Sequence, residues 1–75
     1  MKSDAESKAA ILFELTRRER EIVRLLAQGW TNRQIAQELC LTVRTVKFHT
    51  GNLYCKIRVR SRSEAIVWTW KNLRP

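Results

Sequence analysis

Residues 31–57, TNRQIAQELCLTVRTVKFHTGNLYCKI, contain two short amphipathic segments separated by a tight turn. Thr31 and Thr42 each stand before a segment in which apolar residues recur at three-to-four spacing, and threonine at that position is a good N-cap. We therefore expect helices over about residues 32–39 and 43–57. Two helices joined in this way are typical of a helix-turn-helix motif.

A further helix is expected on each side of this motif. The sequence TRRE at 16–19 fits a capping box before a helix over about residues 17–28, and Gly29 stands where a left-handed residue would end that helix. The sequence SRSE at 61–64 fits a second box, before a helix over about residues 62–73. The predicted fold is all-α, a four-helix bundle-like domain that contains a helix-turn-helix.

The length of 75 residues leaves room for one domain. We expect this domain over residues 15–75, after an N-terminal arm or linker over residues 1–14. The single histidine and two cysteines do not make a zinc site, and no serine has the partners of a catalytic group. The prediction is a protein that is not an enzyme and has no cofactor or metal. The longest apolar run, Ala65–Trp70, is far below the roughly 20 residues of a membrane-spanning helix, so no membrane partner is expected.

The two cysteines are interpreted as free thiols in a reducing cytoplasm, because one bridge in a basic chain is weak evidence for an oxidising compartment. Cys40 falls in the turn between the two helices of the motif, where glycine is common, and is expected to be a small packing residue. His49 lies toward the apolar side of its helix. We expect it to be buried or half-buried and to form a hydrogen bond.

Positive charge is concentrated in the part of the chain that is expected to fold. The sequence holds 15 Lys plus Arg against 7 Asp plus Glu, a net charge of +8, whereas acidic residues outnumber lysines within residues 1–16. Residues 41–63 contain several basic residues and no acidic one. Such a field attracts a polyanion. On charge alone, a hydrated basic surface that keeps the protein soluble is an equal alternative.

The helix expected over residues 43–57 has two different sides. At 100° per residue, an apolar stripe lies within about 40° of Val46, formed by Val46, Thr50, Leu53 and Ile57. This stripe should pack on the two preceding helices. The opposite side carries Arg44, Phe48, Gly51 and Cys55, with Lys47 and Asn52 on its shoulders. An exposed Phe48 among cations is not explained by hydration and favours a binding surface.

The outer side of this helix is expected to bind double-stranded DNA. A major groove about 12 Å wide accepts a helix, and its base edges offer acceptors to Arg and Lys and a methyl group to an apolar ring. The residues expected to contact bases are Arg44, Lys47, Phe48 and Gly51. The residues expected to contact the phosphate backbone are Thr31, Thr42, Thr45, Asn52 and Lys56.

The last predicted helix also has two faces. One face combines Ala65, Ile66, Thr69 and Leu73. Val67 and Trp68 lie on another face, which suits a twofold-related second copy. The alternative, that Trp68 folds back over the core of a small domain, is rated equal on sequence.

Two stretches resemble the DNA-binding domain of the LuxR type, also called GerE-like. They are LTRREREIVRLLAQGWTNRQIAQEL at 15–39 and LTVRTVKFHTGNLYCKIRVRSRSEAI at 41–66, and the match extends to about Trp70. The most specific parts are LTRRERE at the start, GWTNRQIA, TVKFH and VRSRSEA.

This resemblance implies a four-helix domain of a transcription regulator that binds an operator as a homodimer through its fourth helix. It places Lys47 and Phe48 where family members contact base edges. It places Thr45, Asn52 and Lys56 near the DNA backbone. A location in the bacterial cytoplasm, associated with the nucleoid, follows as an expectation.

Three residues depart from the family pattern. Gly51 stands where relatives often carry a long or polar side chain, so that position should be read weakly, or through DNA shape and water. Thr50 replaces an aliphatic residue and predicts a slightly softer core. Arg58 stands where glycine commonly follows the third helix, which predicts an ordinary φ or some strain.

One alternative function belongs to a different class. The basic helix-turn-helix could be a protein-interaction module that engages an acidic partner or a subunit of RNA polymerase. Phe48 flanked by cations would serve that role as well. The sequence does not separate a stand-alone regulator from one module of a larger one.

Overall fold

The computed structural model describes residues 14–73, and four helices are labelled in this part of the chain. They are α2 (Arg17–Ala27), α3 (Asn32–Leu39), α4 (Val43–Ile57) and α5 (Arg62–Asn72). The described residues contain no strand, so the predicted all-α class is confirmed. The arm predicted over residues 1–14 lies outside the described residues except for Glu14. None of the helices within 14–73 is both long and apolar enough to cross a lipid bilayer.

The helices begin at the residues that the sequence indicated. The hydroxyl of Thr16 accepts from the backbone N–H of Glu19, whose carboxylate accepts from the Thr16 N–H in return. Thr31 and Gln34 form the same capping box at the start of α3. The hydroxyl of Thr42 accepts from the N–H of Thr45 at the start of α4. Each cap satisfies backbone donors that have no partner within the helix.

The box predicted at 61–64 is only half formed. The hydroxyl of Ser61 accepts from the backbone N–H of Glu64, as expected. The carboxylate of Glu64, however, accepts from the N–H of Arg60 at 2.7 Å, one residue before the cap. The prediction of a complete capping box before α5 is therefore wrong, although the helix starts where it was expected.

Three of the helices end in a left-handed residue. Gly29 has φ 92°, and the next N–H, that of Trp30, donates back to the carbonyl of Leu25. The same pattern follows α3 at Cys40 with φ 56°, and α4 at Arg58 with φ 60°. This is the Schellman ending, in which glycine is the preferred left-handed residue. Of these three helix ends, only that of α2 has glycine at the left-handed position.

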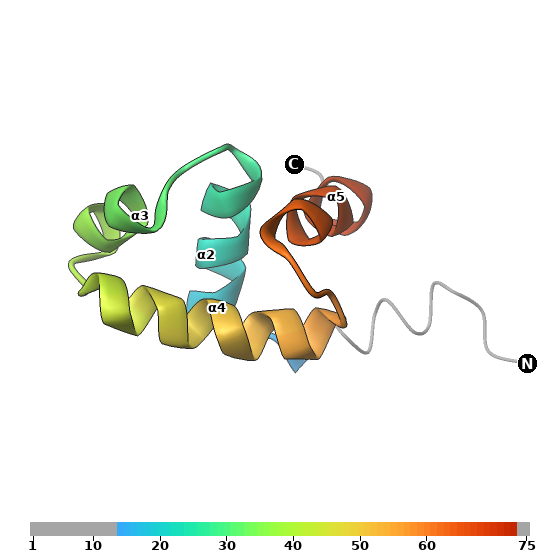
Figure 1. Ribbon diagram of the computed structural model, residues 1–75, viewed down its shortest axis with the longest axis horizontal. Coiled ribbons are helices and arrows are strands. Elements are labelled where there is room, and N and C mark those ends of the chain that lie inside the picture. Colours follow the sequence, from blue (N-terminus) through green and yellow to red (C-terminus); the bar gives the residue numbers. More distant parts are fainter. Residues whose placement is uncertain (1–13, 74–75) are drawn as a thin grey trace, which may run out of the picture.

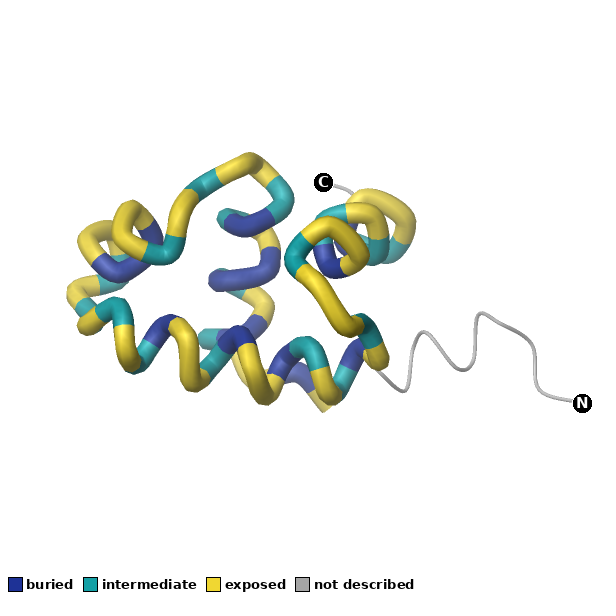
Figure 2. Tube along the Cα trace, viewed as in Figure 1, coloured by how far each residue is buried: buried dark blue, intermediate teal, exposed yellow. Residues whose placement is uncertain are grey.

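The core lies between α4 and the other three helices. The stripe of Val46, Thr50, Leu53 and Ile57 is buried, as the helical wheel predicted. Thr50 also donates its hydroxyl to the carbonyl of Lys47 at 2.9 Å, which satisfies a polar group inside the core. Figure 2 shows these buried positions alternating along α4 with exposed ones. In Figure 1, α3, α5 and most of α2 lie on one side of α4.

Candidate nucleic-acid interface

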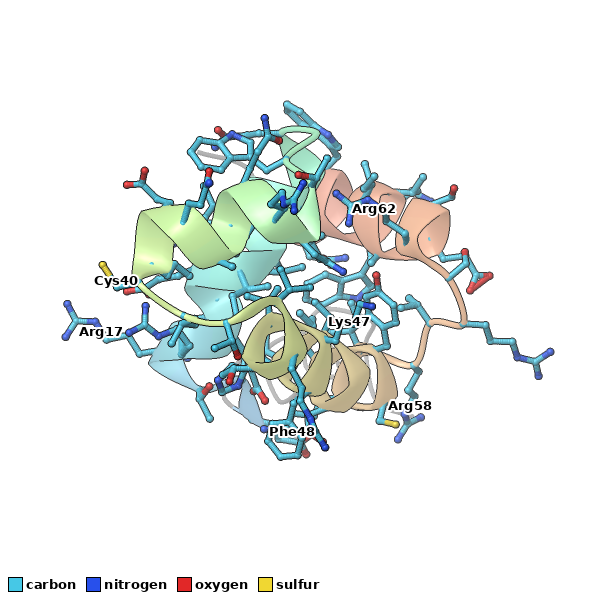
Figure 3. All side chains as sticks on the ribbon, turned by 60° about the vertical axis from the view of Figure 1, so that its left-hand side comes forward. Arg17, Cys40, Lys47, Phe48, Arg58 and Arg62 are labelled. Atoms are coloured by element: carbon cyan, nitrogen blue, oxygen red, sulfur yellow. The ribbon has the colours of Figure 1, made fainter. Side chains whose placement is uncertain are left out.

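The outer side of α4 is exposed along its length. Arg44, Lys47, Phe48 and Gly51 are all exposed to solvent. The side chain of Phe48 stands out among them, with the residue 66% accessible to solvent. Figure 3 shows the Phe48 ring projecting from α4 away from α3 and α5. Within residues 14–73, no carboxylate forms an ion pair with Arg44 or Lys47. The four expected base-contacting residues therefore share one accessible surface.

One side of the Phe48 ring has an aromatic neighbour. The centroids of the Phe48 and His49 rings lie 5.8 Å apart, and the rings are inclined by 67°, an edge-to-face arrangement. Such aromatic pairs prefer this geometry. His49 is half-buried, as expected. Its ring forms no hydrogen bond with another described residue, so the hydrogen bond expected from the sequence is wrong, and its aromatic contact is this one with Phe48.

Gly51 lies one turn beyond Phe48 on the same surface. A Cβ atom built at Gly51 would have nothing within 4 Å, and its backbone is helical rather than left-handed. Neither crowding nor backbone conformation in the free protein therefore requires glycine here. Glycine inside a helix lowers the stability of that helix by roughly 1 kcal/mol relative to alanine. A glycine that the fold does not require points to a role in binding.

The threonines expected to contact phosphates lie at helix N-termini. Thr31 and Thr42 are exposed N-caps of α3 and α4. The Thr42 hydroxyl also donates to that of Thr45 at 2.9 Å, so these two side chains are tied together at the start of α4. Asn52, two turns further along, is exposed. Helix N-termini carry free N–H groups and a positive end of the helix dipole, which suits phosphate oxygens.

Lys56 has a partner inside the protein. Its Nζ lies 2.8 Å from Oε1 of Glu19, a residue that is only 3% exposed. Burial alone would raise the pKa of Glu19, but hydrogen bonds from Lys56 and from Thr16 hold this pKa below its usual value of 4.5. An ammonium has three donors, so the pair leaves donors for a phosphate. The expected contact of Lys56 with the DNA backbone stays a prediction. The structure shows in addition that Lys56 links α4 to α2 through Glu19.

Sequence reasoning did not assign a role to the basic residues that follow α4. Arg58 and Arg60 are exposed, whereas Arg62 turns inward and donates to the backbone carbonyl of Trp30. Figure 3 shows Arg58 near the end of α4 and Arg62 on α5. Arg62 therefore ties the start of α5 to the turn between α2 and α3. The run of basic residues in the sequence indicated a charged surface here. It did not show that Arg62 would turn inward while Arg58 and Arg60 stay exposed.

The two residues proposed for a dimer face differ in burial. Val67 is 52% exposed, whereas Trp68 is half-buried and packs against the core. The alternative in which Trp68 covers the core therefore holds for part of its side chain. Both residues line a shallow groove of about 360 Å³ along α5, together with Ser63, Glu64 and Lys71.

Neither cysteine is buried. Both thiols are free, as expected, but Cys40 is exposed, so its interpretation as a packing residue is wrong. It lies at the end of α3 in left-handed backbone, with φ 56°, and this residue is exposed rather than packed. No group of three potential metal-ligating side chains occurs in the part of the chain that is described.

Comparisons with known proteins agree with this arrangement. A family model described as "Bacterial regulatory proteins, luxR family" matches residues 14–69. The chain is 33% identical over 72 residues to the response regulator protein VraR of Staphylococcus aureus, and equally to those of Staphylococcus saprophyticus and Staphylococcus epidermidis. The alignments cover 96% of this chain and 34% of each relative, so the chain spans about a third of their length.

The matched region contains all of α2, α3 and α4 and most of α5. It therefore includes every residue that we expected to contact DNA. The helix-turn-helix, the capped helices and the exposed basic helix are all found within it. The chain belongs to the LuxR, or GerE, family of bacterial regulatory proteins, which are DNA-binding transcription regulators.

Proposed function

We propose that this domain binds double-stranded DNA sequence-specifically by inserting α4 into the major groove. The observation that carries this proposal is the accessible surface of α4, on which Arg44, Lys47 and Phe48 are all exposed. Figure 3 shows the Phe48 ring projecting from this surface, away from α3 and α5. A duplex can approach this surface without displacing another described helix. The cations on it would release counterions from the duplex on binding.

The proposed contacts fall into two groups. Arg44 and Lys47 donate to acceptors on base edges, and Phe48 makes an apolar contact with a base. Beside Gly51, the DNA is read through its shape and through water. Phosphate oxygens are bound by a second group, which comprises Thr31, Thr42, Thr45, Asn52 and Lys56. We add Arg58 to the second group because it is exposed beside the end of α4.

Regulation is proposed to require two copies. A second copy would pack on α5 at Val67 and the exposed part of Trp68, and the two α4 helices would then enter the groove about 34 Å apart. The resulting complex would act on chromosomal DNA in the bacterial cytoplasm. RNA polymerase is a further proposed partner, since regulation of transcription acts through it.

Selection from a random duplex pool tests the central proposal. We expect an enriched operator with two half-sites and an affinity that falls steeply with salt. Lys47→Ala should change the preferred base at one position per half-site, whereas Asn52→Ala should weaken all sequences alike. Both residues are exposed, so both variants should fold.

Two outcomes would contradict the assignment. If Lys47→Ala and Asn52→Ala shift every sequence equally, Lys47 does not read bases. If no sequence is enriched over competitor DNA, sequence-specific binding fails. The second candidate function, an interaction module for an acidic protein, is favoured in that case, because Phe48 among cations suits an acidic partner with an apolar anchor.

A further inference from the structure

We propose that Phe48 and Gly51 together form a recess for the 5-methyl group of one thymine in each half-site. This inference rests on the proposed function and names the base that its apolar contact selects. The Phe48 ring has no hydrogen-bond donor or acceptor, so it cannot read the polar pattern of a base edge. The thymine methyl is the apolar group that the major groove offers to such a ring.

Gly51 is the second part of the recess. In a helix, a side chain leans toward the N-terminus and covers the turn three to four residues before it. A side chain at position 51 would therefore lie over Lys47 and Phe48. Glycine leaves this turn open, and the space where a Cβ would stand has no neighbour within 4 Å. The high accessibility of Phe48, 66%, agrees with an uncovered ring.

His49 limits the positions that the ring can take. The rings of His49 and Phe48 meet edge to face, with centroids 5.8 Å apart. At 100° per residue, His49 lies on one flank of Phe48, and Lys47 and Gly51 lie on the other. A ring supported on one flank loses less freedom when it binds. The side toward Gly51 then remains for the methyl group.

A deoxyuridine scan of the selected operator tests this proposal, because uracil differs from thymine only by the methyl group. Burial of one methyl-sized group corresponds to about a fourfold change in affinity. We expect replacement of one thymine per half-site to weaken the wild-type domain by about fourfold, with other thymines having smaller effects. A cytosine placed there should gain affinity when it is converted to 5-methylcytosine.

Variants assign the methyl effect to the recess. Phe48→Ala should bind thymine and uracil equally at this position, and Phe48→Leu should restore part of the difference. Gly51→Leu should also abolish the difference, because its side chain would cover the ring. Lys47→Ala is the matched control on the same surface: it should bind more weakly overall but keep the fourfold preference for thymine.

The outcomes separate this proposal from the proposed function. An enriched operator without a methyl-dependent position, or one whose methyl effect survives in Phe48→Ala, overturns the recess and leaves DNA binding intact. Failure to enrich any operator overturns both. Unchanged thermal unfolding of Phe48→Ala, expected for an exposed ring, ensures that the comparison concerns folded protein.

Discussion

Glu19 joins the beginning of α2 to the end of α4, the helix proposed to enter the groove. Its carboxylate accepts from the Thr16 N–H at 2.9 Å and from Lys56 Nζ at 2.8 Å. The local pattern predicted the first contact, because capping partners are three residues apart. It could not predict the second, because Lys56 lies 37 residues away in the sequence. That pairing depends on how α2 and α4 pack.

Glu19→Gln should destabilise the domain by about 1–3 kcal/mol, because the amide oxygen can still cap the helix but the ion pair with Lys56 is lost. Urea unfolding measures this. Glu21→Gln is the matched control, since Glu21 pairs with Arg17 and Arg18 at the surface and its loss should cost under about 0.5 kcal/mol. Equal effects of the two substitutions would refute the structural role of Glu19.

The same experiment at lower pH gives a second readout. The pKa of Glu19 is lowered in the folded state from its usual 4.5, so its stabilising contribution is present above that pH and is lost as pH falls through the folded-state pKa. Wild-type stability should therefore approach that of Glu19→Gln as the solution is acidified below about pH 4.5. A constant difference between the two proteins would contradict the assignment.

At the scale of the helices, the sequence predicted starts better than ends. Threonine and serine caps are local signals, and all four helices begin where these signals indicated. The ends after α3 and α4 were less visible because Cys40 and Arg58 occupy left-handed positions that glycine usually marks. For Arg58, the sequence left an ordinary or a strained φ open, and the structure has a left-handed φ of 60°. The backbone N–H groups of Leu41 and Val59 donate back into α3 and α4, and these bonds go with a conformation at both residues that side chains disfavour.

Arg58→Gly should therefore stabilise the domain by about 0.5–1 kcal/mol, because glycine removes the left-handed strain at a partly offsetting cost in chain entropy. Thermal or urea unfolding measures the change. Arg58→Ala is the control: it removes the same charge but keeps a Cβ, so it should not give this gain. A gain of equal size in both variants would mean that charge repulsion, rather than strain, was relieved.

At the scale of the whole molecule, the surface of α5 is the part that sequence reasoning left most open. A helical wheel assigns residues to faces but does not say how far a large ring reaches toward the core. Trp68 is half-buried, and Val67 beside it is exposed. Within the proposed dimer face, Val67 is therefore the position where a substitution can affect association without disturbing the fold.

Val67→Glu should shift the monomer–dimer balance toward monomer, because a carboxylate would be buried without a partner in the apolar contact. Sedimentation with and without operator DNA measures this, and binding to a single half-site should be retained. Gln37→Glu, the same gain of charge on the exposed side of α3, is the control. An unchanged balance in Val67→Glu would remove this face of α5 from the dimer.

Arg44, Lys47 and Phe48 are exposed and do not belong to the buried core, which α4 builds with its opposite side. The residues proposed to choose an operator are thus physically separate from those that keep the protein folded. Exchange of these surface side chains alone could therefore change which DNA sequence the domain prefers, with little loss of folding stability.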